Sequence, residues 1–122
     1  MTTPLHQMKA EFFKVLSHPL RIRVLELLSE HEYSVGELLG DVQVEPSNLS
    51  QQLAVLRRAG LVTTRKEGST VYYSLTSDQI ADLMAVARTI LTSMLSEQAE
   101  LLTSLRSDAR TARRNLVRKG AR

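Results

Sequence analysis

The segment from Ile80 to Leu105 contains neither glycine nor proline, and it constrains the fold more than any other part of the chain. Its 26 residues predict one uninterrupted helix of about 39 Å, at a rise of about 1.5 Å per residue. Apolar residues recur along it at helical and heptad spacings, which predicts a broad apolar stripe on one side. The stripe consists of Ile80, Leu83, Met84, Ala87, Ile90, Leu91, Met94 and Leu101.

The apolar stripe of so long a helix must be buried, and the rest of the chain is too small to bury all of it. The body before it has about 75 residues, enough for one modest core. The stripe therefore requires a second chain or a folding-back of the C-terminal segment, and a symmetric homodimer is the simpler solution. We expect Leu5, Met8 and Phe12 of the first helix to join the dimer interface.

Composition excludes several classes of protein. With 122 residues, 43% of them hydrophobic and 24% charged, the chain should fold around one core, which we place at residues 5–105. It contains no cysteine, so disulfides, thiolate metal sites and cysteine nucleophiles are ruled out. No phosphate-cradling glycine loop or histidine cluster is present. No apolar run reaches membrane-spanning length, and no secretion signal is visible. We expect a cytoplasmic protein without catalytic activity, cofactor or membrane partner.

Positive charge is concentrated in two places. Residues 106–122 carry seven Lys or Arg against Asp108, whereas residues 1–105 carry nine basic and twelve acidic side chains. Within that acidic body, residues 47–75 hold four basic side chains against Glu67 alone. We interpret residues 106–122 as a mobile basic tail, either merely solvated or contributing to affinity for a polyanion such as DNA.

Three short helices are predicted before residue 45, at residues 5–16, from Pro19 to about Leu28, and at residues 35–39. Pro19 opens the second because proline is tolerated in the first turn of a helix, and His18 helps to form the junction before it. Ser34 and Glu37 fit a capping box that starts the third helix. A connection over residues 40–44 follows.

A fourth helix is predicted from Pro46 to Ala59. Leu49, Leu53 and Leu56 form its buried stripe, and Gly60 suits a left-handed C-terminal cap. The remaining face is polar and can bond to base edges and phosphates, although it could also be a solvated surface. The predicted DNA-binding residues are Ser47, Asn48, Ser50, Gln51, Gln52 and Arg58.

Residues 61–66 and 70–75 are rich in threonine, valine and tyrosine and predict a β-hairpin with Glu67-Gly68-Ser69 at its tip. Such a hairpin would bring basic and hydroxyl side chains to DNA backbone or minor groove. The predicted contacts are Arg65, Lys66, Ser69 and Thr70. The two basic residues could also serve as edge-strand charges that block sheet aggregation.

This order of elements is typical of a winged helix-turn-helix, mainly α-helical with a small β-hairpin, whose second motif helix enters the DNA major groove. Three segments resemble the ArsR/SmtB family of dimeric bacterial repressors. Residues 13–22 (FKVLSHPLRI) are similar to its opening run, residues 47–62 (SNLSQQLAVLRRAGLV) to its recognition-helix signature, and residues 71–75 (VYYSL) to its wing.

The family's usual metal ligands are missing. Its cysteine motif is replaced by residues 33–39 (YSVGELL), and residues 78–105 contain four carboxylates and no histidine. Gln52 stands where the recognition signature usually has histidine. We therefore expect no metal site and no metal sensing. Regulation would come from an unidentified small molecule, a partner protein or the amount of protein, with the dimer interface as the natural place for a pocket.

The resemblance implies a homodimeric transcriptional regulator, a repressor, that binds a pseudo-palindromic operator in double-stranded DNA. Two other functions stay open on the residues alone. An architectural DNA-binding protein would bind without sequence preference, and a helical interaction adaptor would not bind DNA.

Overall fold

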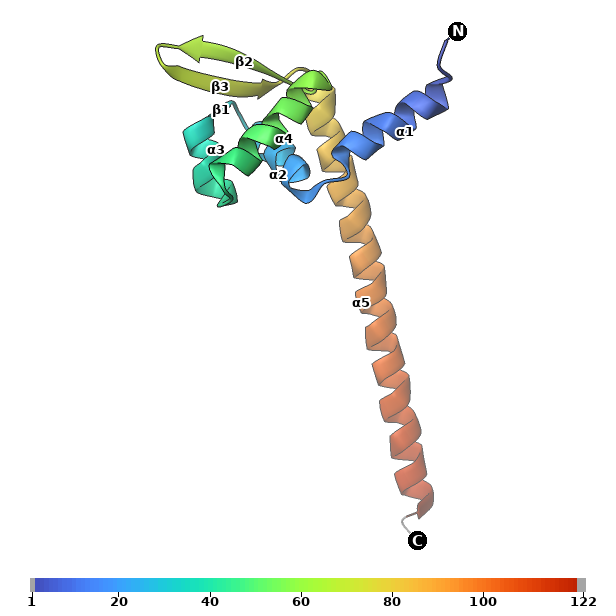
Figure 1. Ribbon diagram of the computed structural model, residues 1–122. Coiled ribbons are helices and arrows are strands. Elements are labelled where there is room, and N and C mark those ends of the chain that lie inside the picture. The colour runs from blue at the N-terminus through green and yellow to red at the C-terminus, as the bar shows by residue number, and fades with distance from the viewer. Residues whose placement is uncertain (1, 121–122) are drawn as a thin grey trace. The chain divides into compact units, whose positions relative to one another are not determined.

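The computed structural model describes residues 2–120, so residues 121 and 122 of the predicted tail lie outside the described residues. The chain divides into two compact units, residues 1–85 and 86–122. Figure 1 labels the elements, which are α1 (Leu5–Leu16), α2 (Pro19–Leu28), β1 (Tyr33–Ser34), α3 (Val35–Val42), α4 (Pro46–Arg58), β2 (Val62–Glu67), β3 (Thr70–Leu75) and α5 (Asp78–Gly120).

The core of the first unit lies where α2, α3 and α4 pack together. Leu25, Leu38 and Leu49 are fully buried there, as are Leu53 and Leu56 of α4. The predicted leucine stripe of α4 is therefore confirmed. Burial of these leucines fixes the rotation of α4 about its own axis, and that rotation decides which of its side chains face outward.

The predicted ends of the helices in this unit are mostly confirmed. His18 accepts a hydrogen bond from the Leu20 N–H through Nδ1 at 3.2 Å, so it caps α2 directly before Pro19. Ser34 and Glu37 form both bonds of the capping box. Gly60 adopts the left-handed conformation, with a φ of 78°. These local signals work because each satisfies backbone groups within its own segment.

The third helix is longer than predicted. It continues through Gly40 to Val42 and ends at Gln43, which takes the left-handed conformation with a φ of 48°. Leu39 and Val42 pack against the core. Their burial outweighs the helix-breaking tendency of Gly40, which costs only about 1 kcal/mol in a helix interior.

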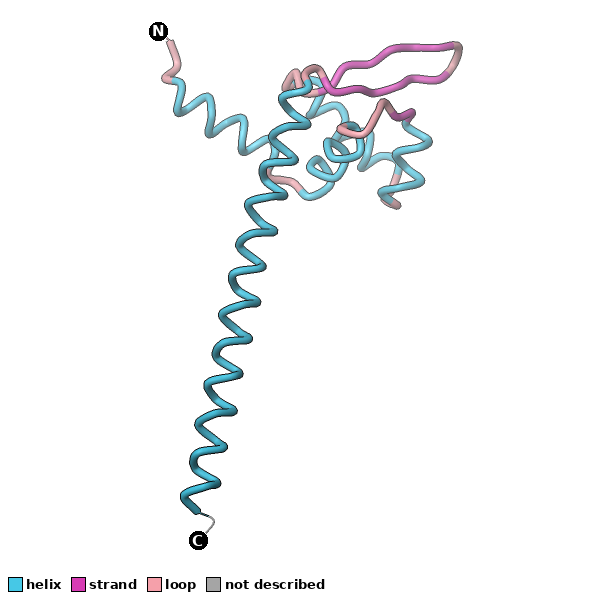
Figure 2. Tube along the Cα trace, turned by 180° about the vertical axis from the view of Figure 1, so that it is seen from behind, coloured by secondary structure: helices cyan, strands magenta, loops and turns pink. Residues whose placement is uncertain are grey.

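The sheet has three antiparallel strands in the order β1-β3-β2, with Gly68 and Ser69 between the two strands of the hairpin. Figure 2 shows the long hairpin in magenta with its turn at the far end. Gly68 has a φ of 63°, which suits a tight turn. The prediction lacked β1, whose two residues pair with β3 through Tyr33 and Tyr73. A strand so short shows no alternating pattern, and it joins the middle of β3 to the start of α3.

The last helix is also longer than predicted, because it begins at Asp78 and continues to Gly120. Residues 106–118 are mainly arginine, alanine, leucine and small polar residues, with no helix breaker. The expectation that the helix ends at Leu105 is wrong. Among the described residues, no helix is both long and apolar enough to cross a membrane.

The predicted dimer stripe divides into a buried and an exposed part. Ile80 is 8% exposed and belongs to the core, and Leu83 and Met84 pack against that core. The prediction that Ile80 lies in the dimer interface is therefore not supported, because its side chain is buried within its own chain. Phe12 is partly buried against the same core. The remaining members are exposed, namely Leu5, Met8, Ala87, Ile90, Leu91, Met94 and Leu101.

Candidate nucleic-acid interface

The N-terminal half of α4 offers polar side chains to solvent. Ser47, Asn48, Ser50 and Gln51 are all exposed, while Leu49 between them is fully buried. No side chain caps the N-terminus of this helix. Pro46 has no N–H, and the Asn48 and Leu49 N–H groups donate to the backbone oxygen of Glu45 at 3.0 and 3.2 Å. This end of α4 therefore offers DNA its hydrogen-bonding side chains rather than a set of free backbone amides.

Gln52 does not belong to this exposed face, and the prediction that it is offered to DNA is wrong. It is 8% exposed. Its Oε1 accepts a hydrogen bond from Arg21 Nε at 2.8 Å, and its Nε2 donates one to Asn48 Oδ1 at 3.2 Å. The reason is its position three residues after Leu49, on the buried side of the helix. Buried Gln52 thus fixes the side chain of exposed Asn48 by a hydrogen bond.

Arg21 is a positioning residue that the sequence analysis did not single out. Besides its bond to Gln52, it donates through Nη1 to the backbone oxygen of Val15 at 3.0 Å. One guanidinium therefore connects the last turn of α1, the first turns of α2 and the middle of α4. The partners are 6 and 31 residues away in sequence, so no local pattern reveals the connection.

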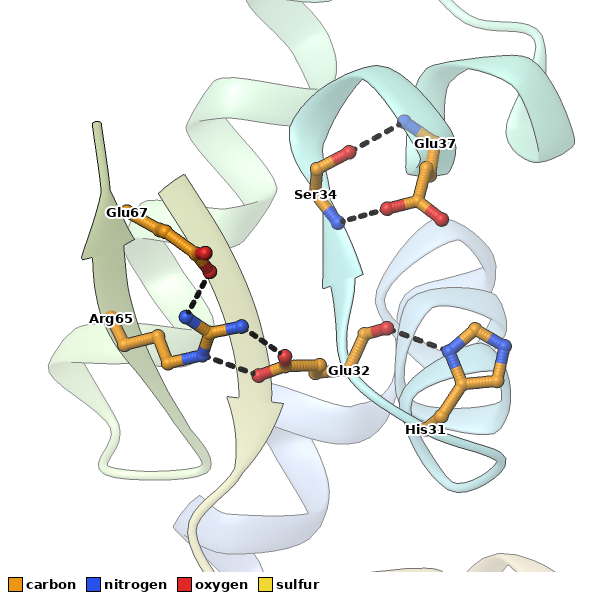
Figure 3. A network of polar contacts seen from close by, with 6 residues as sticks. All are labelled: His31, Glu32, Ser34, Glu37, Arg65 and Glu67. Atoms are coloured by element: carbon orange, nitrogen blue, oxygen red, sulfur yellow. Dashed lines mark hydrogen bonds and ion pairs between the residues drawn. The ribbon is translucent and has the colours of Figure 1, made fainter. Parts of the chain in front are cut away.

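The outer half of β2, toward the tip of the wing, is held by a network of ion pairs around Arg65 (Figure 3). Arg65 bonds to both carboxylate oxygens of Glu32, through Nε at 3.0 Å and through Nη2, and its Nη1 bonds to Glu67 at 2.7 Å. Its guanidinium carbon also lies 4.5 Å from the ring centroid of Tyr72. Two carboxylates thus balance the charge of Arg65, and its predicted contact with DNA stays a prediction.

Lys66, Ser69 and Thr70 are exposed at and beside the tip of the hairpin. Successive side chains of a strand point to opposite faces, so Lys66 lies on the other face from Arg65 and Glu67. No ion pair engages Lys66 within the part of the chain that the structure describes. It is therefore the wing cation best able to meet a phosphate.

The network predicts a pH-sensitive contact. Hydrogen bonding to Arg65 lowers the pKa of the Glu32 carboxyl below its ordinary value and raises that of Arg65. Because the pKa of Glu32 is lower in the folded state, its ion pair stabilises the wing at every pH above the ordinary pKa of a carboxyl group. This stabilisation is lost as the pH falls through the lowered pKa of the folded state. We expect Arg65→Ala to return the Glu32 pKa toward normal in an NMR titration. Lys66→Ala should leave it unchanged, and equal effects of both variants would contradict the pairing.

Two shallow hollows flank α4 and the wing. One has a volume of about 390 Å³ and lies between α4 on one side and Val35 and Tyr73 on the other. The residues of α4 that line it include Ser50, Ala54, Arg57 and Arg58. The other, of about 410 Å³, lies between the start of α3 and the start of β3. Arg57, which the prediction left out of the site, thus shares a concave surface with Arg58.

Metal-ligating residues do not gather in the described part of the chain: no three histidines or carboxylates there lie close enough to hold an ion. His18 caps α2. His31 stacks on Tyr33, with ring centroids 4.3 Å apart, and bonds to the backbone oxygen of Glu32 at 2.6 Å.

A helix pair formed by α3 and α4, followed by a β-hairpin, defines a winged helix-turn-helix protein. The chain belongs to the ArsR family: residues 18–64 match the family model described as "Bacterial regulatory protein, arsR family". Members of this class are DNA-binding transcriptional regulators.

Three known proteins illustrate the relationship. The HTH-type transcriptional regulator Rv0081 of Mycobacterium tuberculosis is 56% identical over 105 residues, which cover 85% of this chain and 92% of the relative. Its crystal structure matches with a TM-score of 0.74 over 80% of this chain and 99% of that one. The biofilm growth-associated repressor of Xylella fastidiosa is 42% identical over 81 residues, covering 66% and 71% of the two chains. The homodimeric winged helix-turn-helix domain of Mb0332 from Mycobacterium bovis is 27% identical, with a TM-score of 0.69 over 76% and 86%.

Proposed function

We propose that this regulator is a repressor that binds a pseudo-palindromic operator as a homodimer. The observation that carries the proposal is the row of exposed hydrogen-bonding side chains on the N-terminal half of α4, held at a fixed rotation by the leucines beneath it. Serine, asparagine and glutamine recognise base edges by their donors and acceptors. A merely architectural protein needs cations rather than such a face.

In this proposal α4 lies in the major groove, and Gln51, Ser47, Ser50 and Asn48 contact bases or phosphates there. Arg58 and Arg57, at the other end of the helix, contact the DNA backbone. Lys66, Ser69 and Thr70 meet phosphates beside the adjacent minor groove. Gln52 and Arg21 touch no DNA and orient α4 instead.

Dimerisation is proposed from the apolar side chains that the folded chain leaves exposed. Ile90, Leu91 and Met94 of α5 are 53%, 57% and 50% exposed, and Leu5 and Met8 of α1 are 65% and 56% exposed. Apolar stripes of this size are typically covered by a second chain. A homodimeric relative and repressor relatives support both parts of the proposal.

Gln51→Ala tests base recognition. If Gln51 meets a base edge, the variant should lose about 1 to 3 kcal/mol of discrimination between operator and random DNA. Fluorescence anisotropy titrations on both duplexes measure this difference, and Gln79→Ala, the same change at an exposed position outside α4, is the matched control. Equal losses on the two duplexes would place Gln51 on a phosphate.

Lys66→Ala tests the wing. Each phosphate contact that is lost should reduce the slope of log affinity against log salt by about 0.9, without changing sequence preference. Titrations at several salt concentrations measure the slope, with Lys9→Ala as a control on exposed α1. A slope equal to that of the control would exclude Lys66 from the DNA contact.

A further inference from the structure

The C-terminal third of α5 is an amphipathic helix with a face of arginines. At about 100° per residue, five arginines fall within an arc of about 140°, which they share with Ser107 and Val117. We call this the arginine face, and it consists of Arg106, Arg110, Arg113, Arg114 and Arg118. Had these residues formed a disordered tail, they would have no common face, so the continuation of the helix beyond Leu105 creates this surface.

The arginine face carries unbalanced charge. All five side chains are exposed, and no ion pair links any of them to a carboxylate among the described residues. Asp108 is the one acidic residue between positions 106 and 120, and it lies outside the arc. In the same protein Arg65 is neutralised by two carboxylates, so the five arginines differ from an arginine that has a structural role.

The opposite side of the same segment is apolar. Leu101, Leu105, Ala109, Ala112 and Leu116 fall within an arc of about 80° centred roughly 150° from the middle of the arginine face. They continue the stripe that we propose for dimerisation. A second copy can therefore cover the apolar side while the arginines remain accessible to another partner.

We propose that the arginine face binds the phosphate backbone of duplex DNA, as a second, sequence-independent contact in addition to α4 and the wing. This inference rests on the proposed function. The five arginines extend over about 18 Å of helix, along which duplex DNA presents about ten phosphates at one charge per about 1.7 Å. The planar guanidinium suits bidentate bonding to phosphate, and all five positions are arginine rather than lysine.

A membrane surface fits this segment less well. Helices that lie in the membrane interface have a wide apolar face rich in bulky and aromatic residues. Here the apolar side is narrow, two of its members are alanine, and residues 78–120 contain no aromatic residue.

The test replaces all five arginines by glutamine in the full chain. We expect affinity for operator and for scrambled duplex to fall by at least about tenfold at moderate salt, and the salt slope to fall by about 0.9 per lost contact. The ratio of the two affinities should stay unchanged. Replacing the same five residues by lysine should preserve most of the slope. Circular dichroism and sedimentation verify helicity and assembly, and Arg110→Gln with Arg114→Gln, the milder variant, should give an intermediate loss.

The outcomes separate this inference from the proposed function. Unchanged affinity and slope in the five-glutamine variant, with Gln51→Ala still lowering operator preference, would overturn the arginine face alone. Failure of the wild-type protein to bind any duplex would overturn both. Arginine-dependent binding to phosphatidylglycerol vesicles, with DNA affinity unaffected by the variant, would assign the face to a membrane instead.

Discussion

Replacing Leu91 and Met94 together by glutamate should separate the dimer and reduce operator affinity by at least about 100-fold. Two recognition helices on one dimer bind two half-sites with an effective concentration that a monomer lacks, and this coupling is worth factors of about 10² to 10⁴. Charges at these positions would have to be buried without partners in the interface. Neither residue belongs to the core of the first unit, so each separated chain should stay folded.

Sedimentation equilibrium and operator titration measure this result on the same samples. Ser93→Glu with Ser96→Glu adds the same charge on the other side of α5 and should leave both assembly and affinity intact. A monomeric Leu91→Glu, Met94→Glu variant that keeps wild-type operator affinity would refute dimeric recognition.

The second large effect should come from Arg21→Met. This change removes both donors that hold the Gln52 side chain and the Val15 carbonyl, and hydrogen bonds to a charged group contribute about 1.5 to 3 kcal/mol each. Because Arg21 is only partly buried, we expect the free energy of unfolding to fall by about 2 to 3 kcal/mol in total. The preference for operator over random DNA should also fall, because α4 loses its side-chain link to α1 and α2, and because Gln52, which bonds to exposed Asn48, is no longer held.

Urea denaturation measures the stability change, and the titration on two duplexes measures the preference. Arg23→Met is the matched control, because Arg23 lies on the same helix but is exposed and has no such bonds. If both variants behave alike, Arg21 contributes only its general charge and does not position α4.

Local signals predicted most of the element boundaries in this protein. Pro19, the pair Ser34 and Glu37, and Gly60 each act on backbone groups within a few residues, so their effect can be derived without the tertiary structure. The leucine stripe of α4 is equally local, because helical spacing alone places its members on one side. Gln52 lies three residues after Leu49 and four before Leu56, a spacing that places it on the same buried side of the helix. Its position therefore predicts burial, whereas its polar side chain suggested exposure.

Long-range partners account for what the sequence did not predict. Arg65 meets Glu32 across 33 positions, and Arg21 meets Gln52 across 31. Neither spacing leaves a periodic pattern, so both arginines resemble ordinary surface cations in the sequence. The short strand at Tyr33 exists only because β3 is beside it. At the C-terminus, the high density of arginine predicted a tail, whereas helix propensity and regular apolar spacing keep residues 106–120 helical.

Sequence-specific DNA binding is tested most directly by titrating the wild-type protein against the DNA upstream of its own gene. An excess of scrambled duplex of equal length and composition serves as competitor. We predict that the complex persists, with affinity for the upstream duplex at least about 10³-fold higher than for the scrambled one. Equal displacement by scrambled DNA would contradict sequence-specific binding and indicate an architectural protein, and the absence of any complex would contradict DNA binding altogether.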